Sequence, residues 1–470
     1  MDRSQNKYAY LKWVVFGIIG LRALLLFLVP LLDKTEARYG EIARLMHETG
    51  NWVMLQFDYG VPFWGKPPLS TWLSAFSFEV FGVNEFAARF HSFLIALLII
   101  WLIIKFLNIQ GIARYALAFI LLTIPEYLLH AGVTSTDSAL LLGVVLTFLS
   151  VWKTVSEEKR SLWSYLFFVG IGIGLLAKGP IVIILTAPPI FIWCFLGKGR
   201  FKLTFTKLPW ILGIIVTAAI AVPWYWLAEK ETPGFIDYFI VGEHFKRFTE
   251  SGWSGDKYGF AKSQPLGMIW LFLLAFAFPW IQILAVVLWK RRKGIWKDPW
   301  VSFLLLWMLW TPIFFTISRN VIHTYILPST IPAALLILHY WKQERHWVKL
   351  GMIFPVLVAL ATLTLWVTGT WRSVMNTDKY LLQEQKVTTN NKDVEVVYWM
   401  QKSYSGRFYS QRKTSVIGTH KALDSLVSSE ERFFLLVQRK RENEIPERVK
   451  SQLVRLDSSL QRNLYIKREE

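Results

Sequence analysis

Apolar residues in this chain gather in long runs instead of alternating with polar residues as they do in soluble domains. A run of about 20 such residues is long enough for a helix to cross a bilayer. The pattern predicts about eleven spans, roughly at residues 13–32, 90–107, 115–132, 138–152, 162–177, 179–196, 209–228, 265–289, 300–317, 324–341 and 350–371. We therefore expect an all-α polytopic membrane protein.

Basic residues are concentrated in alternate connections between these spans, for example at Lys198 to Lys207 and at Lys290 to Lys297. Cytoplasmic loops carry such an excess of lysine and arginine, so the N-terminus is expected in the cytoplasm. An odd number of spans then places residues 372–470 outside. The net charge of +19 is explained by anchoring to membrane lipids, and no nucleic-acid partner is expected.

Two outer connections, residues 33–89 and 229–264, are too long to be simple turns. The residue pattern of the first connection predicts two amphipathic helices that lie along the outer membrane surface. Gly50 should end the first of them. The second should begin after Pro67 and end at Gly82.

The chain is expected to divide into a transmembrane domain, residues 1–371, and a small soluble α/β domain outside the membrane, residues 372–470. In the second part, Val394–Trp399 and Phe433–Val437 have the composition of strands, and Glu447–Leu460 is predicted as a helix. The single cysteine, Cys194, excludes an intramolecular disulfide and a cysteine metal site.

Ionisable side chains are rare inside the spans, where Arg22 and Glu126 are the clear exceptions and could form an ion pair. The other notable polar residues belong to outer loops or outer span ends. They are Asp33, Glu36, Arg38, Lys66, Asp137, Lys178, Glu243, His244, Arg247, Arg319, His323 and Tyr325. Carboxylates mixed with lysine, arginine and tyrosine on one face suit an anionic phosphate ligand together with a general base.

Each of these residues also has an ordinary structural explanation. The alternatives are a capping box for Asp33 and Glu36, a helix cap for Asp137, a snorkelling side chain for Lys178, an interfacial ring for Tyr325 and a solvated loop histidine for His244. A metal site formed by His244 and Glu243 would still need a third ligand. The joint arrangement on one side of the membrane therefore carries more weight than any single residue.

Many of these residues belong to motifs that follow one another with the order and spacing of a known family. The motifs are Thr35–Arg44 (TEARYGEIAR), Gly50–Trp52, Lys66–Leu69 (KPPL), Phe81–Arg89, Thr136–Asp137, Ala177–Pro180, Pro223–Tyr225, Glu243–Phe248, Phe278–Trp280 and Thr324–Pro328. Over about residues 30–330 the chain resembles the bacterial lipid A aminoarabinose transferases and their relatives among the protein O-mannosyltransferases, which belong to the GT-C class.

The resemblance implies a GT-C-like helical core in the bacterial inner membrane with a cavity open to the outside. It implies transfer, with inversion, of a sugar from a polyprenyl-phosphate donor to a lipid A, glycan or protein acceptor. The residues that match the family's phosphate contacts are Lys66, Arg247 and Tyr325, with Arg38 near the same phosphate, and Lys178 is added to this group. Asp137 matches a second acid of the site, and His244 matches a position that can hold a divalent metal.

Two departures from the family pattern change these expectations. Thr35 stands where the aminoarabinose transferases have their key acid, so Glu36 or Asp33 would have to serve as the base. Gly65 stands where they have an acid before the lysine, which leaves His244 without its usual partner for a metal. Two other classes of function remain open, a transporter or flippase of lipid-linked glycans and a scaffold that uses residues 372–470.

Overall fold

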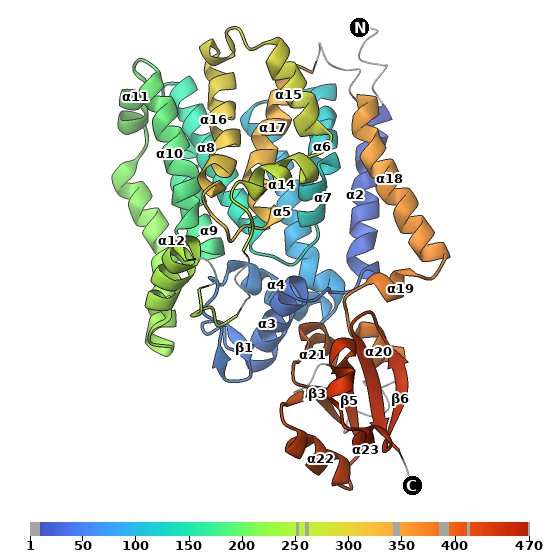
Figure 1. The fold of residues 1–470 in the computed structure, drawn as a ribbon. Helices are drawn as coiled ribbons and strands as arrows, with labels where there is room; N and C mark the ends of the chain where they lie inside the picture. The colour runs from blue at the N-terminus through green and yellow to red at the C-terminus, as the bar shows by residue number, and fades with distance from the viewer. Residues whose placement is uncertain are drawn as a thin grey trace.

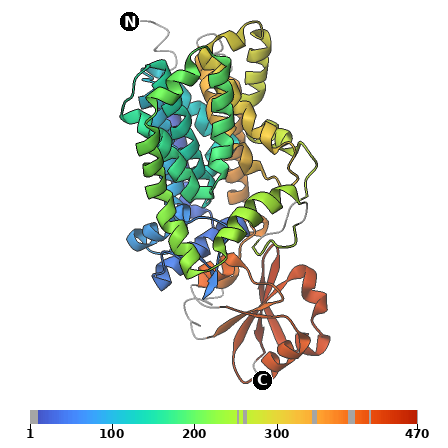
Figure 2. The same cartoon turned by 90° about the vertical axis from the view of Figure 1, so that its left-hand side faces the viewer.

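The computed structural model describes residues 10–250, 253–258, 263–341, 348–384, 394–410 and 414–468. Long helices form a bundle, a small domain that contains a sheet lies beyond one end of it, and the first loop lies between the two (Figures 1 and 2). The predicted combination of several long apolar helices and a small C-terminal region with a sheet is confirmed.

Every predicted span has a helical counterpart. They are α2 (Tyr10–Leu28), α5 (Glu85–Phe106), α6 (Ile112–Thr123) with α7 (Pro125–His130), α8 (Asp137–Ser156), α9 (Leu162–Lys178), α10 (Ile181–Leu196), α12 (Trp210–Glu231), α14 (Met268–Phe276) with α15 (Trp280–Lys290), α16 (Pro299–Phe315), α17 (Leu327–His339) and α18 (Val348–Val367). Two short helices, α11 (Arg200–Lys207) and η2 (Ile295–Lys297), lie in basic connections.

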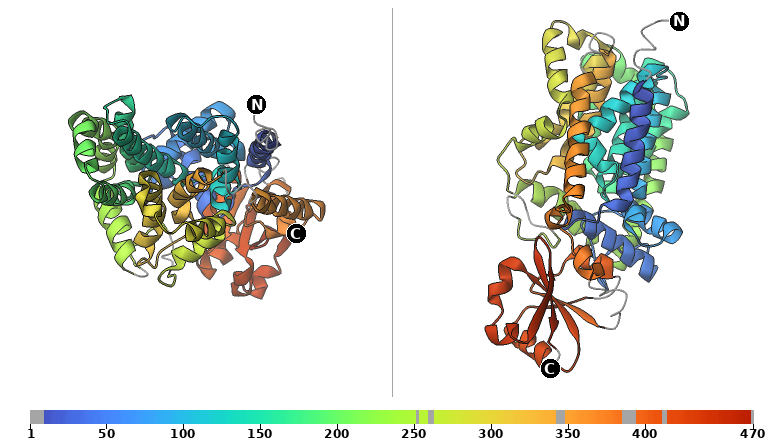
Figure 3. Two further views of the ribbon diagram at one scale, coloured as in Figure 1. Left: turned by 90° about the horizontal axis from the view of Figure 1, so that it is seen from above. Right: turned by 90° about the vertical axis from the view of Figure 1, so that its right-hand side faces the viewer.

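The count of eleven spans is not confirmed by helix length. Within the described residues, five helices are long and apolar enough to cross a membrane, or six if α14 and α15, bent by 101° to one another, are one span. The centre of the bundle is α8, whose most apolar stretch is 89% buried. The corresponding values for α2 and α18 are 17% and 6%, so these two helices lie at the rim, as Figure 3 also shows.

Glycines allow α8 and α9 to pack closely. A Cβ atom added to Gly143 would lie 2.6 Å from the carbonyl oxygen of Gly170 and 2.9 Å from the nitrogen of Gly174. The two helices run in opposite directions, so the first residue of α8, Asp137, and the last of α9, Lys178, lie at the same end of the bundle.

Gly143→Ala is expected to destabilise the protein by about 1–3 kcal/mol, because the added methyl group must push α9 away from α8. Gly20→Ala is the matched control, since a Cβ atom on this residue of α2 would meet nothing within 4 Å. Thermal unfolding of both variants in detergent would measure the difference. Equal melting temperatures would contradict the close packing described here.

The first loop contains the two predicted helices, α3 (Thr35–Thr49) and α4 (Leu69–Phe81), joined through two short strands, β1 (Gln56–Asp58) and β2 (Val61–Pro62). Gly50 ends α3 with a φ of 66°, and Gly82 ends α4 with a φ of 72°. Residues that carry a Cβ atom rarely adopt such positive φ angles. Both predicted ends are confirmed.

That α3 lies along the outer membrane surface stays a prediction, but the contacts of this helix are mainly with protein. Protein covers most of this helix, polar residues included, because α4 and the C-terminal domain both pack against it. The buried Glu41 pairs with Arg44 of the same helix at 2.7 Å, and Arg407 of the C-terminal domain lies 3.4 Å from it. The apolar face of α3 packs into a hydrophobic cluster with Phe78 of α4 and Phe408 of the C-terminal domain, and its buried Glu41 pairs with charges beside that cluster.

The C-terminal domain is built on a five-stranded sheet with the order β4-β3-β5-β7-β6. Its strands are β3 (Glu395–Trp399), β4 (Ser415–Ile417), β5 (Phe433–Gln438), β6 (Leu453–Ser458) and β7 (Arg462–Lys467). Its short helices are α20 (Lys379–Glu384), α21 (Tyr404–Ser410), α22 (His420–Ser428), η5 (Arg439–Glu444) and α23 (Glu447–Lys450), and α19 (Trp371–Val374) precedes them.

The strands β3 and β5 confirm two predictions in this domain, but the predicted helix over Glu447–Leu460 is wrong. Only α23 is helical there, and β6 follows it, paired antiparallel to β7.

Asp33 fastens the C-terminal domain to the start of the first loop. Its carboxylate accepts hydrogen bonds from the hydroxyls of Ser403 and Ser405 at 2.5 and 2.7 Å and from the N–H of Ser405 at 3.0 Å. Burial and the neighbouring carboxylate of Asp378 raise the pKa of Asp33. The predicted capping box is therefore not formed, because Asp33 binds a distant part of the chain.

Asp33→Ala is expected to loosen this docking by about 1–3 kcal/mol, because buried donors of Ser403 and Ser405 lose their acceptor. Limited proteolysis should then cut between the two domains faster than in the wild type. The exposed residue Glu430 provides the control, as Glu430→Ala leaves the interface unchanged. Identical cleavage rates for all three proteins would contradict this role of Asp33.

Candidate active site

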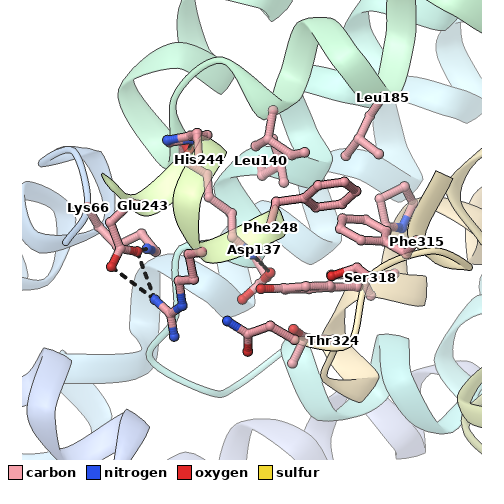
Figure 4. Close-up of a pocket in the computed structure, with 17 residues that line it drawn as sticks. Lys66, Asp137, Leu140, Leu185, Glu243, His244, Phe248, Phe315, Ser318 and Thr324 are labelled. Atoms are coloured by element: carbon pink, nitrogen blue, oxygen red, sulfur yellow. Dashed lines mark hydrogen bonds and ion pairs between the residues drawn. The ribbon is translucent and has the colours of Figure 1, made fainter. Parts of the chain in front are cut away.

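A pocket of about 810 Å³, its open mouth included, lies where the ends of α8, α9 and α17 meet the first loop and η1 (Asp237–Lys246). Figure 4 shows that its polar side chains point toward one another from these separate elements. The predicted site residues that line it are Lys66, Asp137, Lys178, Glu243, His244, Arg247 and Tyr325. The expectation that these residues gather at one end of the bundle is confirmed.

Asp137 and Lys178 form an ion pair inside this pocket. The ammonium nitrogen of Lys178 lies 2.5 Å from a carboxylate oxygen of Asp137, and it also lies 4.8 Å from the centre of the Tyr325 ring. Asp137 is the first residue of α8, yet its carboxylate caps no N–H group there. Neither the helix-cap explanation of Asp137 nor the snorkelling explanation of Lys178 fits these contacts.

Glu243 holds two further cations at the pocket. Its carboxylate lies 2.8 Å from the ammonium nitrogen of Lys66 and accepts hydrogen bonds of 2.8 and 3.1 Å from Arg247. Burial would raise the pKa of Glu243, but the charges of Lys66 and Arg247 outweigh it and lower the pKa to about 2. Glu243 is therefore ionised at any physiological pH.

Apart from Ser318, Asn320 and Thr324, the rest of the pocket wall is apolar. It is formed by Leu140, Ile181, Leu185, Phe248, Phe315, Leu327 and Pro328. Tyr325 stands between the two regions, with its ring 4.6 Å from that of Phe315 and beneath Lys178. The pocket thus offers fixed positive charge beside an apolar surface.

The possible metal site of His244 and Glu243 is not supported by their contacts. The two ring nitrogens of His244 face the carbonyl oxygens of Phe239 and Lys178, at 2.8 and 3.2 Å, and Glu243 is held by two cations. Across the described part of the chain, no cluster of three His, Cys, Asp or Glu side chains has the geometry to hold a metal ion. His244 is a half-buried anchor between η1 and α9, so the solvated-loop explanation is also wrong.

The two carboxylates predicted to act as the base lie outside the pocket. Glu36 forms a buried double hydrogen bond with Arg89 of α5, at 2.7 and 2.8 Å, and Asp33 binds the C-terminal domain. Neither is among the residues that line the pocket. Both side chains are held in structural contacts, which corrects their interpretation as the base.

Arg38 also lies outside the pocket, although it was predicted to contact the donor phosphate. Its guanidinium donates to the carbonyl oxygen of Tyr258 and lies 5.4 and 5.9 Å from the rings of Tyr39 and Phe63. This side chain joins the first loop to the second.

The predicted ion pair between Arg22 and Glu126 is wrong. Arg22 donates to the carbonyl oxygens of Leu128 and Leu129, at 3.0 and 2.9 Å. Glu126 is buried against His130 at 3.1 Å and His323 at 2.9 Å. His323 is thus used to fix η3 (His323–Ile326), the turn that carries Tyr325 into the pocket.

The sequence analysis missed several residues of the site. Asp256 lies 3.5 Å from Arg247, and Phe248, Phe315 and Asn320 line the pocket. Phe248 follows Arg247 within a motif quoted above, which was a usable signal. No such signal exists in the sequence for Asp256, Phe315 and Asn320, because their positions depend on how separate loops fold together.

Known proteins are similar to this chain in sequence and in fold. The family model described as dolichyl-phosphate-mannose-protein mannosyltransferase matches residues 8–239. Two similar proteins are undecaprenyl phosphate-alpha-4-amino-4-deoxy-L-arabinose arabinosyl transferases. The one from Pseudomonas fluorescens is 28% identical over 79% of this chain, and the one from Erwinia tasmaniensis is 30% identical over 72%. The chain covers 66% and 63% of their lengths.

A solved structure has the same fold along nearly the whole chain. It is ArnT from Cupriavidus metallidurans bound to undecaprenyl phosphate, which aligns with a TM-score of 0.74 and 17% identity over 97% of this chain and 98% of its own. The apo structure of the same protein aligns with a TM-score of 0.73. The chain therefore has the GT-C fold of membrane glycosyltransferases and is a relative of the bacterial lipid A aminoarabinose transferases.

Proposed function

We propose that this chain is a glycosyltransferase that moves a sugar from a polyprenyl-phosphate donor to an acceptor on the outer side of the bacterial cytoplasmic membrane. The observation that carries the proposal is the pocket itself, where Lys66, Lys178 and Arg247 stand beside an apolar wall. A phosphate attached to a long hydrocarbon chain needs both of these surfaces. Names of relatives that include undecaprenyl phosphate support the same class of donor.

In the proposed reaction, Lys66 and Arg247 contact the donor phosphate, Tyr325 donates a hydrogen bond to it, and Lys178 lies beside it. The acceptor oxygen forms a bond to the anomeric carbon from the face opposite the phosphate, so the configuration inverts. The bond between the anomeric carbon and the phosphate oxygen breaks, and its electron pair leaves with the lipid phosphate. Fixed cations stabilise the charge that develops on this leaving group.

We propose that Asp137 takes the proton of an acceptor hydroxyl. Unlike Glu36 and Asp33, which were predicted to be the base, Asp137 lines the pocket. Lys178, at 2.5 Å, keeps it ionised and holds it in position. An acceptor that is already a phosphate would need no such proton transfer, and Asp137 would then orient it.

The acceptor is proposed to be lipid A, with a glycan or a protein as the alternatives. The relatives' names support an aminoarabinose-like donor sugar. The pocket and the C-terminal domain are proposed to face outward, with the N-terminus in the cytoplasm, because basic residues gather in the connections at the opposite end of the bundle.

The decisive test is sugar transfer by the purified full chain. Undecaprenyl-phosphate aminoarabinose and lipid A are incubated with the protein in detergent, and mass spectrometry follows modified lipid A and free undecaprenyl phosphate. Formation of both in equal amounts supports the proposal. Movement of the lipid-linked sugar across a proteoliposome membrane without any transfer would favour the transporter or flippase instead.

A further inference from the structure

Glu243 lies between the two cations that the proposed function assigns to the donor phosphate. Its carboxylate is 2.8 Å from Lys66 on one side and 2.8 Å from Arg247 on the other, and its side chain is only 3% exposed. Figure 4 shows this carboxylate at the polar side of the pocket, with dashed lines to its partners. One internal negative charge is thus shared between the two cations and partly neutralises them before any ligand arrives.

The backbone keeps Glu243 in this place. It belongs to η1, a π-helix, a form that occurs mostly as short segments at functional sites. The next residue, His244, fixes η1 to the end of α9 through the carbonyl oxygen of Lys178. Because the helix is anchored on that side, Glu243 cannot easily leave when a phosphate enters.

The donor and the lipid-phosphate product of the proposed reaction carry different charges. The donor is a phosphate diester with one negative charge, whereas the lipid phosphate that remains is a monoester with a charge of about −1.5 to −2 near neutral pH. Cations beside an apolar wall attract the more highly charged species more strongly. A pocket with unopposed cations would therefore retain its own product.

We propose that Glu243 is an internal counter-ion that competes with phosphate for Lys66 and Arg247 and thereby speeds release of the lipid-phosphate product. The inference rests on the proposed function. In this role Glu243 is a positioning residue that lowers the affinity of the pocket for lipid phosphate and raises the rate of product release. A residue that served only to align the two cations would have the opposite effect on affinity.

Glu243→Gln separates these two roles, because glutamine keeps the size and an accepting oxygen but removes the charge. We expect the Kd of the full chain for undecaprenyl phosphate to fall by about tenfold. Both kcat and KM for the donor should fall with it, and inhibition by added undecaprenyl phosphate should become stronger. Unchanged or weaker binding by a folded variant would overturn the inference.

Asp256→Asn provides a second variant in case Glu243→Gln folds poorly. Asp256 lies farther from Arg247, at 3.5 Å. The Kd of Asp256→Asn for undecaprenyl phosphate should therefore also fall, but by less than that of Glu243→Gln. Glu79→Gln is the matched control, because this exposed glutamate of α4 pairs with His47 away from the pocket, and its Kd should equal that of the wild type. Tighter binding of undecaprenyl phosphate by Glu243→Gln alone, or by both site variants, supports the inference. If Glu243→Gln cannot be purified, unchanged or weaker binding by Asp256→Asn overturns it.

The same titration distinguishes this inference from the proposed function. Failure of the wild type to bind undecaprenyl phosphate would overturn the proposed function, and the inference with it. Binding and sugar transfer by the wild type, without tighter binding by the site variants, would overturn the inference alone.

Discussion

Lys66→Ala is expected to lower kcat/KM for sugar transfer from a polyprenyl-phosphate donor by about 10²–10³-fold. The variant removes one charged contact from the leaving phosphate. It also leaves Glu243 to pair with Arg247 alone, which holds the remaining cation back from the phosphate. Both effects act in the same direction. Initial rates of lipid A modification at several donor concentrations would measure the loss.

Lys230→Ala is the control for this prediction. Lys230 is an exposed lysine at the end of α12, 5.3 Å from the Trp226 ring, so the variant removes one positive charge without touching the pocket. Its rate should stay near that of the wild type. Similar rates for Lys66→Ala and Lys230→Ala would exclude Lys66 from the phosphate site.

Asp137→Asn is expected to lower kcat by about 10²–10⁴-fold when the acceptor is a hydroxyl, because the amide cannot accept the acceptor's proton. Donor binding should be kept or improved, since Lys178 loses its carboxylate partner and becomes available to the phosphate. A single-turnover experiment with the donor bound in advance would separate these two effects.

Asp237→Asn serves as the comparison for Asp137→Asn. Asp237 is exposed at the start of η1, at the same end of the bundle, and lies outside the pocket. If Asp137→Asn kept more than about a tenth of the wild-type rate, proton transfer to Asp137 would have to be abandoned. Loss of donor binding together with the rate would instead indicate a structural role for the carboxylate.

Local patterns were enough to predict the helices and the side of the bundle that carries the site. Gly50 and Gly82 end helices because their backbone angles suit glycine, and this preference is visible in the sequence. Asp137 and Lys178 were both placed at outer span ends, since the length of an apolar run fixes where a helix leaves the bilayer. The structure places both at the same end of the bundle, where they form an ion pair at 2.5 Å.

Partners of charged residues could not be predicted in the same way. Glu36 was considered for the base because it follows Thr35, yet it pairs with Arg89, and Glu126 pairs with His323 instead of Arg22. Sequence shows which residues carry charge, but the tertiary fold decides which charges meet. The strand β6 was mistaken for a helix for a related reason, because its partner β7 supplies the hydrogen bonds that local composition does not reveal.

The contact of Asp33 with Ser403 and Ser405 determines when the first loop can complete its folding during synthesis of the chain. A ribosome makes Asp33 early and Ser403 late, so the nascent chain holds an unfinished first loop while most of its helices are already being inserted. The loop reaches its final environment once the last domain has been synthesised and has arrived on the same side. Translation arrested within the last spans would therefore leave a bundle whose first loop still lacks its contacts with the C-terminal domain.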